Sequence, residues 1–476
     1  MVRPILIARD NEIQRLQKCM NETNAQLVIL YGRRRVGKTY LINCFFERRF
    51  DFKVTGMHQE KRETQLKNFA TELSDQMKED IAVPKDWTDA FRLLRNYLKS
   101  LPEDEKHVVF FDEFPWFDTR NSGFLSAFEH FWNDFGCSLP NLILIICGSA
   151  TTWMTKNIAM NQGGLFLRHT CSMYLQQFNL KQTEEYLHAR GIEWSRYDII
   201  RCYMILGGIP YYLSLLDADK SLNMNIDNLF FRKRAELWNE FNLLYKTLFK
   251  NSKQYMRIVE TLGKKRNGMT RQEISQATGM TDNGNLTDLL DDLENSDFLR
   301  VTSSFGKEKK EMIYQLCDYY TLFYIKFIKG YRGRDEHFWS HTYGSPSVNA
   351  WSGLTFEQVC KDHIEEIKRK IGISAVLTNE STWFLKGDEE RRGTQIDLII
   401  DRNDHFINLC EMKYSDKEYV IDKDYDGILR ERLELFRKET KTRKTIQYVF
   451  ITSFGVKANK YSNIISSQVT LDDLFS

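Results

Sequence analysis

Residues 27–39 read Leu-Val-Ile-Leu-Tyr-Gly-Arg-Arg-Arg-Val-Gly-Lys-Thr, an apolar run that leads directly into a G-x-x-x-x-G-K-[ST] motif. In the order strand, glycine-rich loop and helix, backbone N–H groups and a helix N-terminus face bound phosphates. The stretch therefore predicts a site for a nucleoside triphosphate and Mg²⁺. Lys38 would contact the β- and γ-phosphates, and the Thr39 hydroxyl would ligate Mg²⁺. The residues expected to contact the nucleotide here are Gly32, Arg33, Arg34, Arg35, Val36, Gly37, Lys38, Thr39 and Tyr40.

A second apolar run, residues 108–111, is followed by two adjacent acids, Asp112 and Glu113. Carboxylates at the end of a buried strand are unfavourable unless a cation or hydrogen bonds receive them. In a nucleotide hydrolase, Asp112 would help to hold Mg²⁺, and Glu113 would act as the general base that polarises water. A third run, residues 142–146, ends in Cys-Gly-Ser, which makes Ser149 a candidate sensor of the γ-phosphate. The alternative for Asp112 and Glu113 is a pair of acids that face solvent, and the alternative for Ser149 is an ordinary turn.

The composition limits the class of protein. A chain of 476 residues predicts about three domains, and its 42% hydrophobic content is enough for each to bury a core. A net charge of +2 favours no general partner, so contacts with nucleic acid would need local basic patches. The nine cysteines include no C-x-x-C pair, which favours free thiols in a reducing cytoplasm. No run approaches the roughly 18 apolar residues of a membrane span, so we expect a cytoplasmic protein with no membrane partner.

Changes in residue pattern divide the chain into five predicted segments. Residues 1–180 alternate apolar runs with amphipathic segments, the pattern of an α/β layered sheet, and residues 181–250 have helical periodicity. Residues 251–320 predict three helices followed by a two-stranded hairpin, the order of a winged helix-turn-helix. Residues 321–350 form an aromatic-rich connector, and residues 351–476 predict a second α/β domain.

The predicted third helix of the winged helix is acidic, which argues against a role in reading DNA. Carboxylates close to phosphates lose the counterion release that drives binding. Only the predicted wing is basic, so packing or protein contact is the alternative to DNA recognition. The acids are Asp282, Asp288, Asp291, Asp292 and Glu294, and the wing lysines are Lys307, Lys309 and Lys310.

The last segment holds acids and a lysine in an order that suits metal-assisted phosphodiester hydrolysis. Asp397 lies in one predicted strand, and the next predicted strand ends in Glu411-Met-Lys413. Residues i and i+2 of a strand share a face, so Glu411 and Lys413 point the same way. Asp397 and Glu411 would bind Mg²⁺, and Lys413 would orient water or offset charge in the transition state. Glu357, on a preceding predicted helix, would complete the metal site. A structural salt-bridge cluster is the alternative.

With these motifs in place, the chain resembles the archaeal-type ATPase family of the STAND branch of P-loop NTPases. Its C-terminal segment resembles the PD-(D/E)xK restriction-endonuclease-like superfamily. The resemblance implies a P-loop NTPase domain with a parallel sheet, a helical lid, a winged helix and a nuclease-like α/β domain. Besides the phosphate loop and the four C-terminal residues, it is carried by Ile7-Ala-Arg-Asp-Asn-Glu-Ile13, Phe-Asp-Glu-Phe-Pro-Trp, Cys-Gly-Ser, Gly207-Gly-Ile-Pro-Tyr211 and Leu471-Asp-Asp-Leu-Phe475.

The resemblance also implies roles by position. Residues 7–13 would lie against the base, and the Gly-Gly-Ile-Pro turn with Pro210 would bring the helical lid onto the nucleotide. Arg168 matches a position where relatives carry a Gly-Arg pair and would contact the γ-phosphate, although Leu167 stands here in place of the glycine. ATP as the nucleotide, rather than GTP, follows from the resemblance alone.

The function expected from the sequence is an ATP-binding and ATP-hydrolysing conformational switch. It would be coupled to a Mg²⁺-dependent DNA nuclease-like domain and serve defence or mobile-element biology. The alternative is an ATP-dependent regulatory or signalling protein whose C-terminal domain binds DNA or a protein partner without cleaving. The expected partners are therefore a nucleotide and DNA, and a homo-oligomer or a protein partner is a further option.

Overall fold

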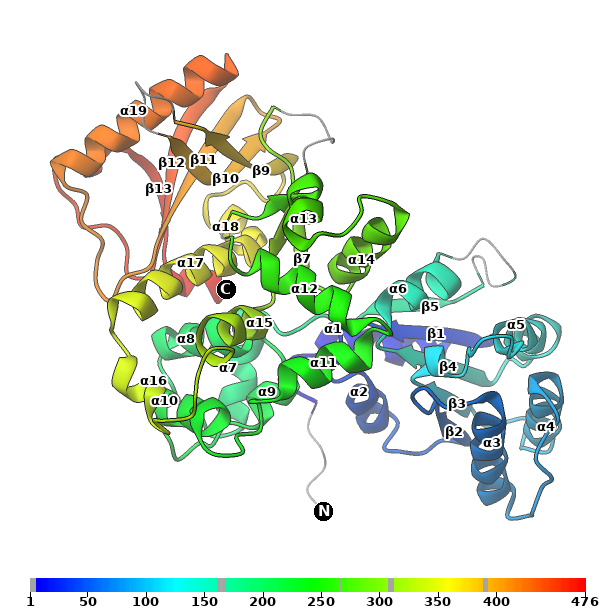
Figure 1. Cartoon of the computed structure of the whole chain (residues 1–476). Coiled ribbons are helices and arrows are strands. Elements are labelled where there is room, and N and C mark those ends of the chain that lie inside the picture. The colour runs from blue at the N-terminus through cyan, green and yellow to red at the C-terminus, as the bar shows by residue number, and fades with distance from the viewer. Residues whose placement is uncertain (1–5, 161–163, 165–167, 266, 307–311, 388–392) are drawn as a thin grey trace. The chain divides into compact units, whose positions relative to one another are not determined.

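The structure is a computed structural model that describes residues 6–160, 164, 168–265, 267–306, 312–387 and 393–476 (Figure 1). The chain divides into two compact units. The first comprises Met1–Gln177, Ile209–Tyr211 and Leu244–Lys250. The second comprises Phe178–Gly208, Tyr212–Leu243 and Asn251–Ser476. Among the residues described, every helix is too short or too polar to cross a bilayer.

The first unit contains a five-stranded sheet in the order β2-β3-β4-β1-β5, and all of its strand pairs are parallel. Its three central strands are continuous apolar runs that are buried along almost their whole length, as parallel strands with helices on both faces must be. The predicted α/β fold with a parallel sheet is thereby confirmed. The strands are β1 (Gln26–Tyr31), β2 (Phe52–Thr55), β3 (His107–Asp112), β4 (Leu142–Gly148) and β5 (Cys171–Tyr174).

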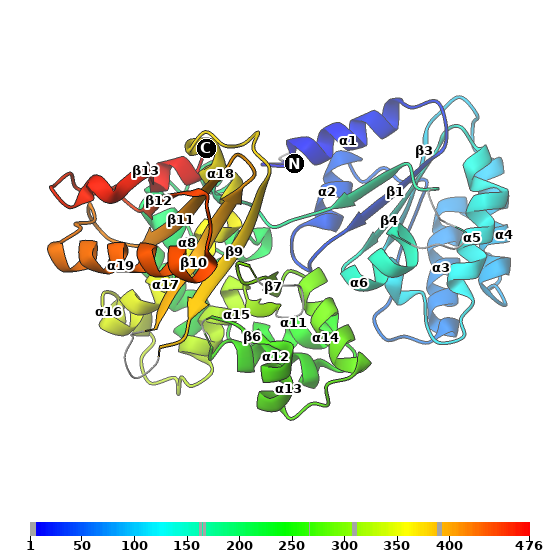
Figure 2. The same cartoon turned by 90° about the horizontal axis from the view of Figure 1, so that it is seen from above.

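Helices cover both faces of this sheet (Figure 2). On one face, α3 (Arg62–Met77), α4 (Trp87–Lys99) and α5 (Phe124–Asp134) bury an aromatic core against the strands. The other face carries α1 (Asp10–Asn21) and α2 (Lys38–Phe45). Because every strand runs in the same direction, the loops that follow β1, β3 and β4 meet at one edge of the sheet.

The second unit begins with a helical part and continues into three helices with a small sheet. Strands β6, β8 and β7 form an antiparallel sheet in that order beside the three helices. The three helices and the β7–β8 hairpin follow the order predicted for residues 251–320, but β6, between α12 and α13, was not predicted. The assignment of this part as a winged helix remains a prediction. The three predicted wing lysines lie outside the described residues. The elements are α7 (Leu180–Ala189), α8 (Arg196–Leu206), α9 (Pro210–Ser214), α10 (Leu222–Ile226), α11 (Glu240–Leu248), α12 (Ser252–Leu262), α13 (Arg271–Thr278), α14 (Gly284–Asn295), β6 (Met269–Thr270), β7 (Leu299–Thr302) and β8 (Ile313–Leu316). Within this stretch, Ile209–Tyr211 and Leu244–Lys250 belong to the first unit.

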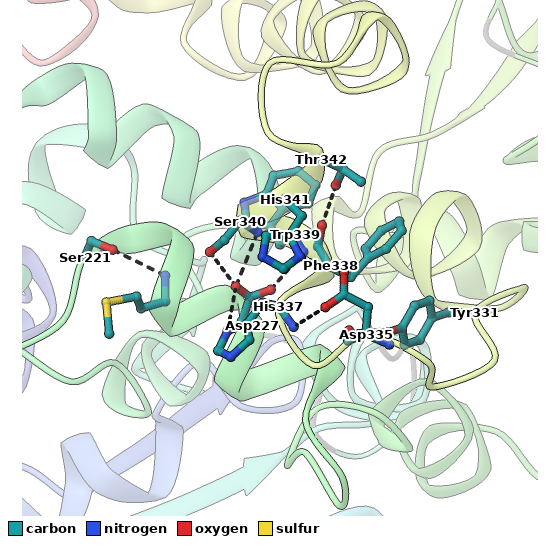
Figure 3. A network of polar contacts seen from close by, with 11 residues as sticks. Ser221, Asp227, Tyr331, Asp335, His337, Phe338, Trp339, Ser340, His341 and Thr342 are labelled. Carbon is teal, nitrogen blue, oxygen red and sulfur yellow. Dashed lines mark hydrogen bonds and ion pairs between the residues drawn. The ribbon is translucent and has the colours of Figure 1, made fainter.

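A buried carboxylate joins distant parts of the second unit (Figure 3). Asp227 accepts hydrogen bonds from the backbone N–H groups of Trp339 (2.8 Å) and Ser340 (3.3 Å), at the start of α16 (Phe338–Thr342). The Ser340 hydroxyl adds a third hydrogen bond of 2.5 Å, and the His337 ring lies 4.0 Å away. Unbonded N–H groups at a helix start need such acceptors. This contact therefore fixes the aromatic connector within the second unit.

The C-terminal part of the second unit is a five-stranded mixed sheet in the order β13-β12-β11-β10-β9. Strands β9, β10 and β11 pair antiparallel, whereas β11, β12 and β13 pair parallel. A long helix, α19, forms the crossover from β11 to β12 and packs apolar residues against the sheet. The elements are α15 (Tyr319–Phe323), α17 (Pro346–Asp362), α18 (Ile364–Lys370), β9 (Thr378–Leu385), β10 (Thr394–Arg402), β11 (Phe406–Lys413), α19 (Lys423–Thr440), β12 (Thr445–Thr452), β13 (Ile465–Val469) and α20 (Leu471–Leu474).

Candidate functional site

The loop between β1 and α2 has a backbone shape that only glycine allows at its two ends. Gly32 has φ of 145°, and a Cβ there would lie 2.4 Å from the carbonyl oxygen of Leu175. Gly37 has φ of 92° and precedes the first residue of α2. A Cβ at Gly37 would meet no heavy atom of the described residues within 4 Å. The space beside Gly37, at the N-terminus of α2, is therefore open, which suits a phosphate site.

Lys38 is buried inside this loop. Its ammonium group donates to the carbonyl oxygens of Gly32 and Arg33, each at 2.8 Å. Burial lowers the pKa of Lys38, and the nearby groups of Cys147, Glu113 and Asp112 only partly oppose this effect. An ammonium group in such surroundings is stabilised when an anion approaches. The donor set therefore fits the β- and γ-phosphates of a nucleotide.

Thr39 and Asp112 come together although 73 residues separate them. The Thr39 hydroxyl lies 3.0 Å from Oδ1 and 2.9 Å from Oδ2 of Asp112. Burial raises the pKa of Asp112, and the neighbouring charge of Glu113 raises it further. A divalent cation would relieve both effects, and a hydroxyl beside a carboxylate is an oxygen donor set that suits Mg²⁺.

Glu113 follows Asp112 in the chain and accepts hydrogen bonds from Ser149, directly after β4. Its Oε2 accepts a hydrogen bond of 2.8 Å from the Ser149 hydroxyl and one of 3.3 Å from the Ser149 N–H. The backbone of Glu113 has φ of 48°, in the left-handed region that non-glycine residues rarely adopt. Such conformations concentrate at functional sites, where surrounding contacts hold them in place. Ser149 thus positions the carboxylate expected to act as the base.

The arginines of the loop have separate environments. Arg33 is buried, whereas the Arg35 guanidinium lies 4.1 Å from the centre of the Tyr211 ring. The Tyr211 N–H also contacts the carbonyl oxygen of Arg35 at 3.4 Å. Ile209–Tyr211 belongs to the first unit, so Pro210 is placed in the same unit as the phosphate loop.

Arg9 is a loop contact that the sequence analysis did not include among the site residues. Its guanidinium donates to the carbonyl oxygens of Val36 (3.1 Å) and Gln176 (2.9 Å). Burial lowers the pKa of Arg9 to about 10. Arg9 ties the start of α1 to the phosphate loop, and its place in the motif at residues 7–13 was the signal that could have found it.

Three other residues predicted to contact the nucleotide are exposed or half-buried. Tyr40 lies on α2 with an exposed side chain, and Arg34 is half-buried in the loop. Arg168 is exposed, and within the described part of the chain no recorded contact joins it to Lys38 or Thr39. Its role at the γ-phosphate remains a prediction, and Leu167 lies outside the described residues.

In the C-terminal sheet, Glu411 is enclosed by donors. Its Oε1 accepts from the Tyr425 hydroxyl (2.5 Å) and lies 2.7 Å from the Lys413 ammonium group. Its Oε2 accepts from the Arg432 guanidinium at 2.5 Å. Burial acts to raise the pKa of Glu411, but the charges of Lys413 and Arg432 and these hydrogen bonds lower it below its usual range. Both carboxylate oxygens therefore already have donors, and Tyr425 and Arg432 were not predicted.

Asp397 and Glu357 are the other acids expected at this site. The register of β10 with β11 pairs Leu398 with Cys410, so Asp397 and Glu411 are the next positions on their strands. Asp397 accepts a hydrogen bond of 2.5 Å from the Gln395 carboxamide, and Glu357 is half-buried on α17. Within the described residues, no three His, Cys, Asp or Glu side chains are grouped to hold a metal ion. The C-terminal Mg²⁺ site therefore remains a prediction.

Comparisons with known proteins give a family match in the first part of the chain and relatives that cover different shares of it. Residues 6–216 match the model of a family described as an ATPase domain predominantly from Archaea. An uncharacterized protein of Methanocaldococcus jannaschii is 24% identical over 446 residues, which cover 91% of this chain and 92% of that protein. An uncharacterized ATP-binding protein of the same organism is 51% identical over 43 residues, 9% of this chain and 73% of that protein.

Solved structures give matches of lower similarity. The Walker-type ATPase of Pyrococcus abyssi has a TM-score of 0.48 at 19% identity, covering 68% of this chain and 99% of that chain. The ORC2 protein of Aeropyrum pernix, in its ADPNP and ADP complexes, has a TM-score of 0.44 at 12% identity, covering 68% and 94%. The family match supports an ATPase domain over residues 6–216, and with it nucleotide binding and an ATPase function.

Proposed function

We propose that the chain binds ATP with Mg²⁺ and hydrolyses it at the edge of the first unit's sheet. The observation that carries this proposal is the pair of contacts Thr39–Asp112 and Glu113–Ser149. In this assignment Lys38 binds the phosphates, Thr39 and Asp112 hold Mg²⁺, and Glu113 accepts a proton from the attacking water. The cation would supply charge stabilisation for the phosphoryl group.

The test separates binding from hydrolysis. Glu113→Gln should keep ATP affinity and lower kcat by about 10²- to 10⁴-fold, the usual contribution of a general base. Lys38→Ala should instead weaken ATP binding itself. The matched control is Glu72→Gln, which changes a partly buried carboxylate on α3 of the same unit. Normal turnover in Glu113→Gln, or a comparable loss in Glu72→Gln, would contradict the assignment.

We also propose that the C-terminal domain acts on DNA as a Mg²⁺-dependent nuclease, with ATP controlling its access to the substrate. The proposal is supported by Asp397 and Glu411 at adjacent positions of paired strands, and by Lys413 on the same strand face as Glu411. A further support is the order of a helix, antiparallel strands, a crossover helix and a parallel strand. Defence or mobile-element biology is the setting in which such a coupled activity would serve.

A specific observation favours the alternative, in which the C-terminal domain binds DNA or a protein without cleaving. Arg432 and Tyr425 already donate to Glu411, so a cation would have to displace them. The deciding experiment incubates the full chain with plasmid, linear and single-stranded DNA while ATP and Mg²⁺ are varied separately. Cleavage that Asp397→Ala and Lys413→Ala both abolish supports the nuclease. DNA binding without cleavage under every condition supports the alternative.

A further inference from the structure

Two of the acids that argue against DNA contact take part in contacts within the three-helix part. The Arg271 guanidinium Nε donates to Asp282 at 2.5 Å, just before α14 begins. Asp292, farther along the helix, accepts a hydrogen bond of 2.5 Å from the Tyr255 hydroxyl on α12. These two carboxylates therefore serve folding contacts. The turn before α14 instead lies beside cationic and uncharged polar side chains.

A hollow of 420 Å³ lies between α12 and the turn that joins α13 to α14 (green in Figure 1). Its lining contains two cations and several amide or hydroxyl groups, and none of the described lining residues is acidic or aromatic. The lining residues are Lys253, Gln254, Arg257, Gly279, Met280, Thr281, Asn283 and Asn285.

The two cations reinforce each other. Lys253 and Arg257 are four residues apart on α12, so their side chains extend over the same helix face. Both are exposed, and no carboxylate among the described residues forms an ion pair with either of them. Unneutralised cations four residues apart repel each other, and an anion placed between them removes that repulsion.

The opposite wall of the hollow is held rigidly. Besides its contact with Asp282, Arg271 donates to the Thr287 hydroxyl (2.6 Å) and to the carbonyl oxygen of Asn283 (2.8 Å). The Asn283 side chain caps α14 by accepting from the N–H of Asn285 at 3.1 Å. The polar groups of the turn are therefore positioned before any ligand arrives, which lowers the entropy lost on binding.

We propose that this hollow binds a backbone phosphate of duplex DNA, a contact that positions the three-helix part on DNA without reading its sequence. Lys253 and Arg257 would pair with the phosphate, and the turn would contact the sugar–phosphate backbone through polar groups. Phosphate and sugar contacts of this kind fix orientation but carry no direct base information. The polar lining, which offers no ring for a base to stack on, favours the backbone over a free nucleotide. The inference rests on the DNA partner assigned above.

The test uses the full chain and a fluorescein-labelled 20-base-pair duplex, with anisotropy measured across a series of salt concentrations and without ATP or Mg²⁺. Lys253→Ala/Arg257→Ala should reduce the slope of log K against log salt by about two, since each phosphate contact contributes roughly one. At 0.1 M salt, this corresponds to roughly 10- to 100-fold weaker binding. A duplex of scrambled sequence should show the same loss. Lys253→Arg/Arg257→Lys should retain most of the affinity.

The matched control is Arg232→Ala/Lys233→Ala, which removes the same two charge types from exposed positions of the same unit. This control should leave the salt slope within error of the unchanged chain. An unchanged slope in Lys253→Ala/Arg257→Ala, or a loss confined to one DNA sequence, would overturn the proposal. Stoichiometric binding of inorganic phosphate or ATP at the hollow without duplex binding would overturn it as well.

ATP turnover and DNA cleavage, measured on the same variants, separate this proposal from the proposed function. Lys253→Ala/Arg257→Ala should hydrolyse ATP at the normal rate without DNA, because its changes lie in the second unit, outside the unit that holds the phosphate loop. Asp397→Ala should keep the duplex affinity while losing any cleavage. Loss of ATPase in Glu113→Gln with intact duplex binding would show that the two sites act independently.

Discussion

Lys38 illustrates how a single buried charge can report on ligand binding. Its pKa is lowered by burial in the phosphate loop, and bound phosphates would restore the charged form. ATP binding should therefore take up protons, and the uptake should grow as the pH rises toward the ordinary lysine pKa. ATP affinity should accordingly fall with rising pH in the alkaline range. Calorimetry in buffers of different ionisation enthalpy measures the uptake, and no uptake at any alkaline pH would contradict this expectation.

The pKa of Asp112 is shifted in the opposite direction to that of Lys38, and this gives a prediction about stability. Its pKa is raised, first by burial and then by Glu113, so the folded state holds this proton more strongly than the unfolded state does. The stability that this proton contributes is present at low pH and is lost as the pH rises through the raised pKa. Asp112→Asn should therefore raise the melting temperature in the nucleotide-free state at neutral pH, since the neutral amide avoids a buried charge.

The same variant should lose Mg²⁺-dependent turnover. Activity of the unchanged chain should also fall on acidification at a higher pH than an ordinary aspartate would cause, because Mg²⁺ needs the ionised carboxylate. Thermal scans and pH–rate profiles check the two effects. A melting temperature that falls in Asp112→Asn would show that the carboxylate stabilises the loop.

At the scale of elements, α19 is tied to β11 through the Glu411–Arg432 ion pair. Glu411→Ala should destabilise the second unit, by less than the roughly 3–5 kcal/mol of a fully buried pair, because it leaves the half-buried Arg432 without this partner. Glu411→Ala/Arg432→Ala should cost less than the sum of the two single changes. Because the folded-state pKa of Glu411 is lowered, its contribution is present at neutral pH and is lost as the pH falls. Urea titrations at pH 7 and pH 4 measure both effects, and strict additivity would contradict the coupling.

Replacement by alanine should change stability in opposite directions at two glycines, Gly208 after α8 and Gly427 in α19. At Gly208, a Cβ would lie 1.8 Å from the carbonyl oxygen of Phe178, so Gly208→Ala must displace the backbone after α8. At Gly427, in the exposed face of α19, a Cβ would meet nothing within 4 Å among the described residues. Gly427→Ala should stabilise by about 1 kcal/mol, the helix propensity difference. Gly208→Ala should lower the urea midpoint, and a neutral effect there would show that the turn can relax.

At the scale of the whole molecule, the chain passes repeatedly between the two units. Tyr211 belongs to the first unit, yet Tyr212 already belongs to the second. Because Tyr211 contacts Arg35 of the phosphate loop within the first unit, we expect nucleotide binding to alter the chain at residues 209–211, directly before this second-unit segment begins. ATP can shift an equilibrium between two conformations of the chain only if it binds them with different affinity.

Hydrogen exchange tests that connection. In Glu113→Gln, a non-hydrolysable ATP analogue with Mg²⁺ should slow exchange at residues 209–211 and change exchange in α8, relative to ADP. Lys38→Ala should show neither change, because it does not hold the phosphates. Slower exchange confined to the phosphate loop would indicate that the nucleotide does not control the second unit.

Much of the first unit could be predicted because its signals are local. The glycine-bounded loop, the acid pair and the apolar strands each lie within a few consecutive residues. Parallel strands also bring their carboxyl ends to one edge, so Asp112, Glu113 and Ser149 could be expected near the loop. Arg9, Tyr425 and Arg432 were not included in the predicted site. Arginines and tyrosines on amphipathic helices are too common for their partners to be read from spacing.

β9 was also not predicted. Its buried and exposed positions do not alternate regularly, and it joins the sheet through antiparallel pairing with β10 that shifts register between Ile396 and Ile399. A strand of this kind is defined by its neighbour more than by its own pattern. The same reason applies to the hollow beside α12, whose lining combines two cations with a turn more than 20 residues later in the chain.

The sequence by itself determined the parallel α/β sheet, the phosphate loop and the identity of the acids that follow it. These depend on backbone preferences and apolar periodicity over a few residues. Only the tertiary structure decided which side chains meet: Thr39 with Asp112, Glu113 with Ser149, and Glu411 with both Tyr425 and Arg432. Such pairings form when packing brings distant segments together, and burial then gives each charge a strong need for a partner.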